Sequence, residues 1–272
     1  MELNFSRPRP NRAQAFNFNF DASTRSRAQR MASIERIFDN AMEGEHQRNW
    51  YPKRFERNDA LFELYQGGDS ETFDIEFSVQ GDTFRAHKCI FLLKCKHEIP
   101  NVRGNEEMPI DIDSVTSRSF KCLLEFIYTV KEPELETGDM AAELLNAANF
   151  FGCVDLKLYV ESVMVDKFLE VSNAANRLLF ADAHSLALLK EAAINIVVTN
   201  LNSVRDTEGW SKVRESNRLL EELLDSYAPR SQGDDEIDRL DVAELRNRLQ
   251  EAGLELDGSR ESLVNRLKES AN

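Results

Sequence analysis

The sequence predicts an α+β protein in which a short β-hairpin comes first and helices form most of the C-terminal part. Apolar and polar residues alternate over residues 73–79, which is the period of a strand with one buried face. From residue 117 onward the apolar residues recur at helical spacing instead. No apolar run is long enough to span a bilayer, and so we expect no membrane-spanning helix.

The first folded element is the predicted hairpin. The Gln-Gly-Asp sequence at 80–82 is a turn signal, and residues 83–86 are expected to form the returning strand. Helical spacing of apolar residues favours a helix from about Lys88. Ile110 and Ile112 predict one more short extended segment.

Helices are expected over most of the remaining chain. Asp139 is placed to cap one of them at its N-terminus. The apolar stripes that predict these helices fall within residues 120–128, 144–151, 156–168, 174–179, 186–197, 219–224, 240–249 and 263–267. Residues 229–236 are polar, with Pro and Gly, and are predicted to be a linker.

Charge is distributed unevenly along the chain. The formal net charge is −14, but the first 58 residues hold an excess of four basic residues, and we expect residues 1–57 to be mostly disordered. This arm could bind nucleic acid, direct nuclear import or act as a solubilising tail. The acidic surplus elsewhere is most simply a solvated face, and it repels phosphate backbones. The N-terminus lacks the apolar stretch of a secretory signal, which favours a nuclear or cytoplasmic location.

Catalytic and metal-binding motifs are not found in the sequence. It holds no phosphate loop, no Gly-x-Ser-x-Gly and no His-Glu-x-x-His, so we expect neither an enzyme nor a cofactor. A zinc site at His87, Cys89, Cys95 and His97 is the alternative to structural roles for these residues. The two cysteines would lie about 120° apart on a continuous helix, which argues against convergence on one metal ion.

Residues 73–88 relate the first domain to a known family. They place an aspartate in the first strand, pass through the hairpin and end in Phe-Arg-Ala-His-Lys, where the helix begins. This pattern resembles the BTB/POZ domain, and residues 120–129 and 141–151 fit later parts of that domain. The resemblance implies a dimerisation domain over residues 58–152, in which His87 is structural.

The next segment, residues 153–228, resembles the helical BACK extension. Residues 169–184, together with Gly209 and Trp210, bring the resemblance closest to the speckle-type POZ protein group. The first 58 residues are too short and too polar to resemble the substrate-binding MATH domain of that group.

The resemblance implies the cullin scaffold of a ubiquitin ligase as a partner. Residues 168–198 resemble one cullin-contacting element of the group, whereas residues 97–108 depart from the other. That stretch is short, contains Pro100 and Gly104, and has no hydrophobic-x-Glu motif, which puts cullin binding in question. The candidate partner-binding residues are Asp74, Lys88, Leu169, Leu178 and Leu179. For the Asp74–Lys88 pair, the alternative is a polar pair that fixes the fold.

The C-terminal residues 237–270 resemble the SAP motif, a helical hairpin associated with DNA or RNA. Gly258 and Ser259 would leave the first amides of the second helix free to meet a phosphate, with Arg260 beside them. The other candidate phosphate contacts are Arg246, Arg248, Arg266 and Lys268. The segment is close to neutral, so we expect weak, salt-sensitive binding without sequence preference.

Together these observations predict a protein–protein interaction adaptor that forms a homodimer. The candidate dimer contacts are Leu61, Phe62 and Leu64, in a helix expected at the start of the first domain. The leading hypothesis is a substrate adaptor of a cullin-type ubiquitin ligase with weak nucleic-acid binding. The alternatives are a scaffold with no ligase link and a chromatin-associated transcription cofactor.

Overall fold

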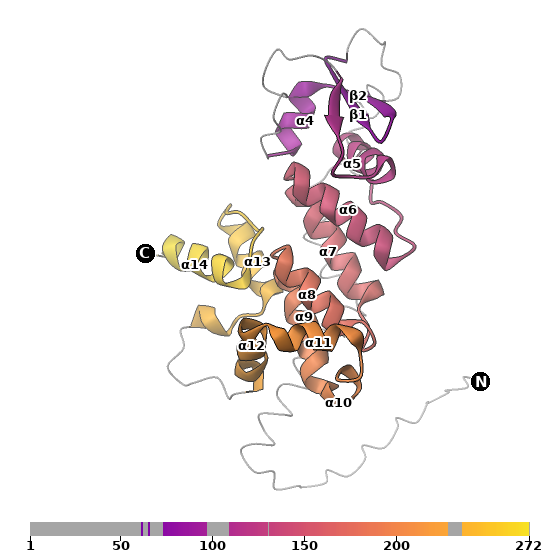
Figure 1. Ribbon diagram of the computed structural model, residues 1–272. Helices are drawn as coiled ribbons and strands as arrows, with labels where there is room; N and C mark the ends of the chain where they lie inside the picture. Colours follow the sequence, from indigo (N-terminus) through magenta and orange to yellow (C-terminus); the bar gives the residue numbers. More distant parts are fainter. Residues whose placement is uncertain are drawn as a thin grey trace, which may run out of the picture. The chain divides into compact units, whose positions relative to one another are not determined.

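The computed structural model confirms the α+β fold class: a small mixed sheet with helices is followed by an all-helical C-terminal region (Figure 1). The predicted basic arm, the segment 97–108 and the predicted linker up to residue 235 lie outside the described residues. The structure describes residues 61, 65, 73–96, 109–129, 131–227 and 236–271.

The sheet has three strands, β1 (Ile75–Val79), β2 (Asp82–Ala86) and β3 (Ile110–Ile112), in the order β2-β1-β3. β1 pairs antiparallel with β2 and parallel with β3. Gln80 and Gly81 join the hairpin with φ values of 52° and 88°. Two central residues with positive φ favour the tight turn whose twist matches that of the flanking strands. The predicted hairpin and the extended segment at Ile110–Ile112 are therefore confirmed.

Helices cover the buried face of β1 and build the first apolar core. Phe77, in the middle of β1, is fully buried, with its ring centroid 5.0 Å from the rings of both Phe91 and Phe120. Alternating burial along β1 results directly from its alternating sequence. The helices of this core are α4 (Lys88–Lys94), α5 (Ser117–Thr129), α6 (Gly138–Phe151) and α7 (Val154–Phe168).

The start of α6 corrects one expectation. Thr137 is the N-cap, because its hydroxyl accepts a hydrogen bond from the backbone N–H of Met140 at 3.2 Å. Asp139 lies in the first turn instead, where a carboxylate interacts favourably with the helix dipole. The prediction that Asp139 caps this helix is therefore wrong by two residues. Gly152 ends α6 in the left-handed conformation, with φ 65°, and α7 begins directly after it.

A second apolar core lies among the next helices. Ion pairs connect three of them at its edge: Lys190 Nζ of α9 lies 2.8 Å from Asp182 Oδ1 of α8 and 2.6 Å from Glu222 Oε2 of α12. The helices of the second core are α8 (Ala174–Ala183), α9 (Ala187–Thr199), α10 (Leu201–Val204), α11 (Glu208–Glu215) and α12 (Asn217–Tyr227).

No helix in the described part of the chain is long and apolar enough to cross a membrane.

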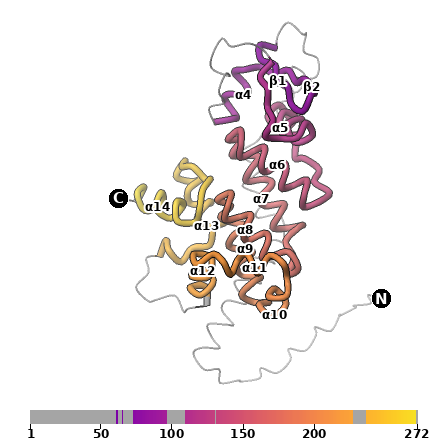
Figure 2. Tube along the Cα trace, in the orientation of Figure 1, coloured from indigo at the N-terminus to yellow at the C-terminus, as the bar shows by residue number. Residues whose placement is uncertain are grey.

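The C-terminal segment comprises a short 3-10 helix, η2 (Glu236–Arg239), and then α13 (Val242–Glu251) and α14 (Arg260–Ala271). The two predicted helices are therefore confirmed as elements, and we refer to residues 236–271 as the C-terminal hairpin. Its apolar residues share one buried cluster with Leu158 of α7 and Ala187 of α9. The hairpin accordingly lies beside α7 and α9 in the trace (Figure 2).

Candidate interaction surfaces

The junction between β2 and α4 is held by Asp74. Its carboxylate accepts the backbone N–H of Lys88 at 2.6 Å, and its own N–H donates to the carbonyl of Ala86 at 3.3 Å. The contact therefore involves the backbone of Lys88 and not its ammonium group. A carboxylate that binds an amide in the first turn of a helix is favourable there, so this contact helps to fix where α4 begins.

Tyr128 binds the same junction from α5. Its hydroxyl accepts the backbone N–H of His87 at 2.7 Å and lies 3.0 Å from Nδ1 of the His87 ring. Tyr65 stacks on the Tyr128 ring, with 4.5 Å between centroids. Burial raises the pKa of Tyr128 to about 12, and the hydrogen bond from His87 opposes that shift. His87, the histidine of the BTB-like pattern, is thus a buried structural residue.

The predicted dimer residues fall largely outside the described part of the chain. Leu61 is described as helical and partly buried, whereas Phe62 and Leu64 are not described. Tyr65, one helical turn after Leu61, connects this segment to the Tyr128 ring and so to the first core.

The candidate partner-binding leucines lie in different environments. Leu178 is completely buried in the second core, so its side chain belongs to the packing of α8 and is not at a surface. Leu169 and Leu179 are partly buried and retain some exposure. Only these two of the three leucines can therefore contact a partner without opening the helical core.

The alternative zinc site is not assembled in the described structure. Cys89 is exposed on α4, while the buried thiols of Cys95 and Cys153 face each other. The hydrogen bond to Cys153, together with burial, raises the pKa of the Cys95 thiol. His97 is not described, and the residues that are described contain no cluster of three or more potential metal ligands.

Arg246, a predicted phosphate contact, is buried inside the molecule. It is 3% exposed, and its guanidinium donates at 2.7 Å to Glu161 of α7, which is completely buried. Its Nε also donates to the carbonyl of Leu256 at 3.3 Å. A phosphate could reach this guanidinium only if the hairpin separated from α7.

The other predicted phosphate contacts also have partners within the C-terminal hairpin. Arg260 donates to the carbonyls of Asp238 and Leu240 at 2.6 and 2.8 Å. Lys268 pairs with Asp238 at 2.7 Å. Arg248 binds Glu244 and Glu236, and Arg266 donates to the carbonyls of Glu255 and Asp257.

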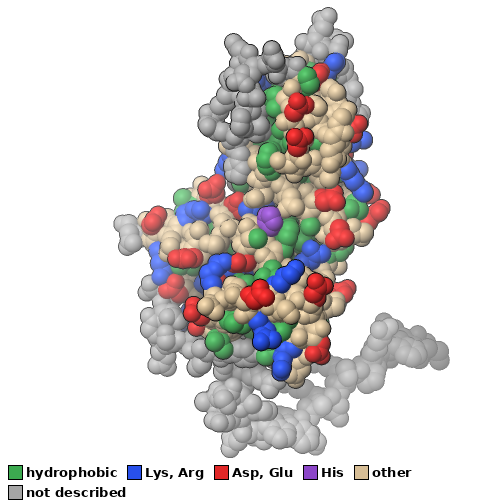
Figure 3. All heavy atoms as spheres, viewed as in Figure 1, with side chains coloured by type: hydrophobic (Ala, Val, Ile, Leu, Met, Phe, Trp, Pro, Cys, Tyr) green, Lys and Arg blue, Asp and Glu red, His purple; other side chains and the backbone are tan. Residues whose placement is uncertain are grey.

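The turn before α14 is likewise involved in internal contacts. Gly258, at φ 120°, forms an isolated parallel bridge with Leu186, just before α9. The Ser259 hydroxyl accepts the backbone N–H of Ser262 at 3.3 Å. Over the face drawn in Figure 3, acidic and basic side chains are interspersed and do not gather into a basic patch.

Glu161 is a buried charged residue at the contact with Arg246 that the sequence does not single out. It occupies the position at which an apolar stripe of α7, formed by Val154, Leu158 and Val165, would continue. A carboxylate inside such a stripe is a signal for a buried pair, because buried charges are seldom left without a partner.

Comparison with known proteins identifies the class of the first domain. Residues 62–167 match the model of the BTB/POZ domain, which includes the sheet, α4–α6 and most of α7. Residues 62–167 are therefore similar to a BTB/POZ domain, and a domain of this kind implies protein–protein interaction.

Its relatives are BTB/POZ proteins with further domains. The chain is 35% identical over 163 residues to the mouse "TD and POZ domain-containing protein 4", covering 57% of this chain and 43% of the relative. It is 34% identical to the mouse "TD and POZ domain-containing protein 1" over 62% of this chain and 47% of the relative. Identity to the Arabidopsis thaliana "BTB/POZ and MATH domain-containing protein 4" is 30%, over 57% and 37%. The chain thus spans less than half the length of these relatives.

Proposed function

We propose that this chain is a non-catalytic adaptor that dimerises through its BTB/POZ domain and recruits a cullin-type ubiquitin-ligase scaffold. The observation that supports the proposal most directly is the BTB/POZ match over residues 62–167, on a fold with the corresponding hairpin and helices. The relatedness to TD and POZ and to BTB/POZ and MATH proteins supports the adaptor role.

In the proposed adaptor, the helical region from α8 to α12 is the part that follows the BTB/POZ domain and contacts the cullin. We refer to it as the helical arm. Two partly exposed leucines, Leu169 at the C-cap of α7 and Leu179 in α8, lie in the stretch that resembles a cullin-contacting element. Apolar side chains that a partner can cover suit the buried core of a protein–protein interface.

A pull-down of purified chain with a cullin N-terminal region tests the ligase link. We expect Leu179→Glu to abolish recovery of the cullin, because a charge would be desolvated at the contact. The matched control is Leu224→Glu, which changes another exposed leucine, 67% exposed on α12, and should leave recovery unchanged. If wild-type chain recovers no cullin, the chain is a scaffold without a ligase link, the alternative favoured by Pro100 and Gly104.

Light scattering on the full chain tests the dimer independently. We expect twice the chain mass of 31.2 kDa at micromolar concentration, and a lower mass for Leu61→Glu. A wild-type mass equal to one chain would refute dimerisation without affecting the cullin result.

Nucleic-acid binding does not form part of the proposed function. The sequence predicts it on the assumption that the basic residues of the C-terminal hairpin are free to meet phosphates. Each of those side chains has an internal partner instead, and Arg246 is buried. This use of the basic residues suggests another role for the hairpin.

A further inference from the structure

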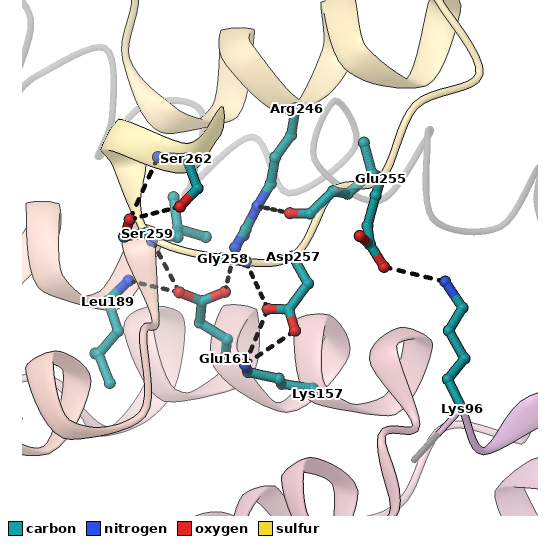
Figure 4. Close-up of polar contacts among 12 residues, drawn as sticks. Lys96, Lys157, Glu161, Leu189, Arg246, Glu255, Asp257, Gly258, Ser259 and Ser262 are labelled. Carbon is teal, nitrogen blue, oxygen red and sulfur yellow. Dashed lines mark hydrogen bonds and ion pairs between the residues drawn. The ribbon is translucent and has the colours of Figure 1, made fainter. Parts of the chain in front are cut away.

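A buried ion pair lies where the C-terminal hairpin meets α7. Oε2 of Glu161 accepts from Arg246 at 2.7 Å, while Oε1 accepts the backbone N–H groups of Leu188 and Leu189 at 2.8 and 3.1 Å (Figure 4). Those two amides belong to the first turn of α9. One carboxylate therefore joins three elements: α7, the start of α9 and the hairpin.

The carboxylate of Glu161 is buried, and its negative charge therefore needs the positive charge of Arg246. Glu161 is 0% exposed, and a buried carboxylate is strongly unfavourable without a compensating positive charge. Two amides satisfy part of its hydrogen-bonding capacity, and the guanidinium of Arg246 is the cation paired with it among the residues that the structure describes. The site on α7 and α9 is therefore complementary to an arginine presented from an apolar surface.

Further contacts surround the buried pair. Lys157, which is also on α7 and almost buried, lies 2.9 Å from Asp257 in the hairpin turn. Glu191 of α9 also accepts the first backbone N–H of α13, that of Val242, at 2.9 Å. The interface therefore combines a shared apolar cluster with polar contacts, as specific docking interfaces do.

The hairpin also reaches the BTB/POZ domain outside α7. Glu255, in the turn between α13 and α14, lies 3.1 Å from Lys96, which lies just after α4 in the chain (Figure 4). Both side chains are half exposed, so this pair adds orientation more than stability. The hairpin nevertheless spans from the end of α4 to the start of α9.

We propose that the C-terminal hairpin is an intramolecular clasp. Its receptor is the face of α7 and early α9 around Glu161, and Arg246 is its recognition residue. The clasp fixes the helical arm against the BTB/POZ domain, and thereby sets where a protein bound to the arm lies relative to one bound to the domain. Docking also buries Arg246 away from phosphates, so the clasp excludes a nucleic-acid site that uses this arginine.

Hydrogen–deuterium exchange on the full chain tests the clasp. We expect Arg246→Met to accelerate exchange about tenfold or more at the amides of Leu188, Leu189 and α13, because breaking a buried pair leaves an uncompensated charge. Exchange in β1 should stay unchanged, which separates undocking from global unfolding.

Two further variants sharpen the result. Arg248→Met, on the same helix, removes an arginine whose ion pairs are exposed, and should leave exchange at α9 as in the wild type. The double variant Glu161→Gln with Arg246→Met removes both charges, and its exchange at α9 should return toward the wild-type rate, since the amide oxygen still accepts the two backbone bonds.

Either of two outcomes would overturn the clasp. One is exchange at Leu188 and Leu189 within about twofold of wild type in Arg246→Met. The other is salt-dependent binding of a labelled DNA oligonucleotide by the wild-type chain that Arg246→Met abolishes without any change at α9. Neither outcome depends on whether the chain binds a cullin.

Discussion

Tyr128→Phe removes a single oxygen atom from the junction at which the β-hairpin meets α4. That oxygen accepts the backbone N–H of His87 at 2.7 Å, and both residues are buried. Phenylalanine keeps the ring and its stacking with Tyr65 but removes the hydrogen bond between the Tyr128 hydroxyl and the His87 amide. An unsatisfied buried donor costs about 1–3 kcal/mol. At roughly 2–4 °C per kcal/mol for a domain of this size, we expect the melting temperature to fall by about 2–12 °C.

Urea unfolding monitored by circular dichroism, together with thermal melts, measures this loss. Tyr65→Phe is the matched control, because it keeps the same stacked pair of rings while removing the hydroxyl that does not bind the His87 amide, and should change stability by less than about 0.5 kcal/mol. If Tyr128→Phe is as stable as wild type to within about 0.5 kcal/mol, the hydroxyl does not satisfy the His87 amide, and the proposed role of this junction is wrong.

Four further outcomes are expected from the same structure. Phe77→Ala should cost about 3–5 kcal/mol in urea unfolding, because it empties the centre of the first core. The pKa of Tyr128 is raised to about 12 from 10.0, so the contribution of its hydroxyl to the free energy of unfolding is complete below pH 10 and is lost as pH rises towards 12. The difference in stability between wild type and Tyr128→Phe should therefore narrow over that interval. Gly258→Ala should destabilise the fold by about 1–3 kcal/mol, because a residue with a side chain is strained at φ 120°. The melting temperature should therefore fall by a few degrees. Arg260→Glu should leave DNA affinity measured by fluorescence anisotropy unchanged, and a marked loss of binding would restore the phosphate role of this residue.

The elements of the fold can be predicted where one local pattern determines them. The alternation over residues 73–79 allows only a strand with one buried face, and Gln80 and Gly81 permit the turn that closes it. The parallel pairing of β3 with β1 cannot be derived in the same way, since it depends on a contact between segments far apart in sequence. The cap at Thr137 escapes prediction because Thr and Asp both favour caps, and spacing does not choose between them.

The candidate site is predicted less well, because exposure is decided by packing between elements. Leu178 and Leu179 are neighbours in the sequence, yet Leu178 is buried in the core and Leu179 is partly exposed. The sequence suggests that Asp74 and Lys88 interact through their charges, whereas the contact is with a backbone amide. A set of residue types at a given spacing identifies the helix, but it does not identify which side of the helix a neighbour covers.

Arg246 and Glu161 illustrate what sequence can still reveal about such packing. Arg246 lies on the same face of α13 as Val242, Leu245 and Leu249, so it interrupts an apolar stripe just as Glu161 does on α7. Neither charge can be accommodated in an apolar interface alone, and the two have opposite sign. Since each stripe needs another element to cover it, pairing the two interrupted stripes satisfies both charges at once. An arginine in the apolar stripe of a terminal helical hairpin therefore indicates docking onto the rest of its own chain before it indicates a phosphate.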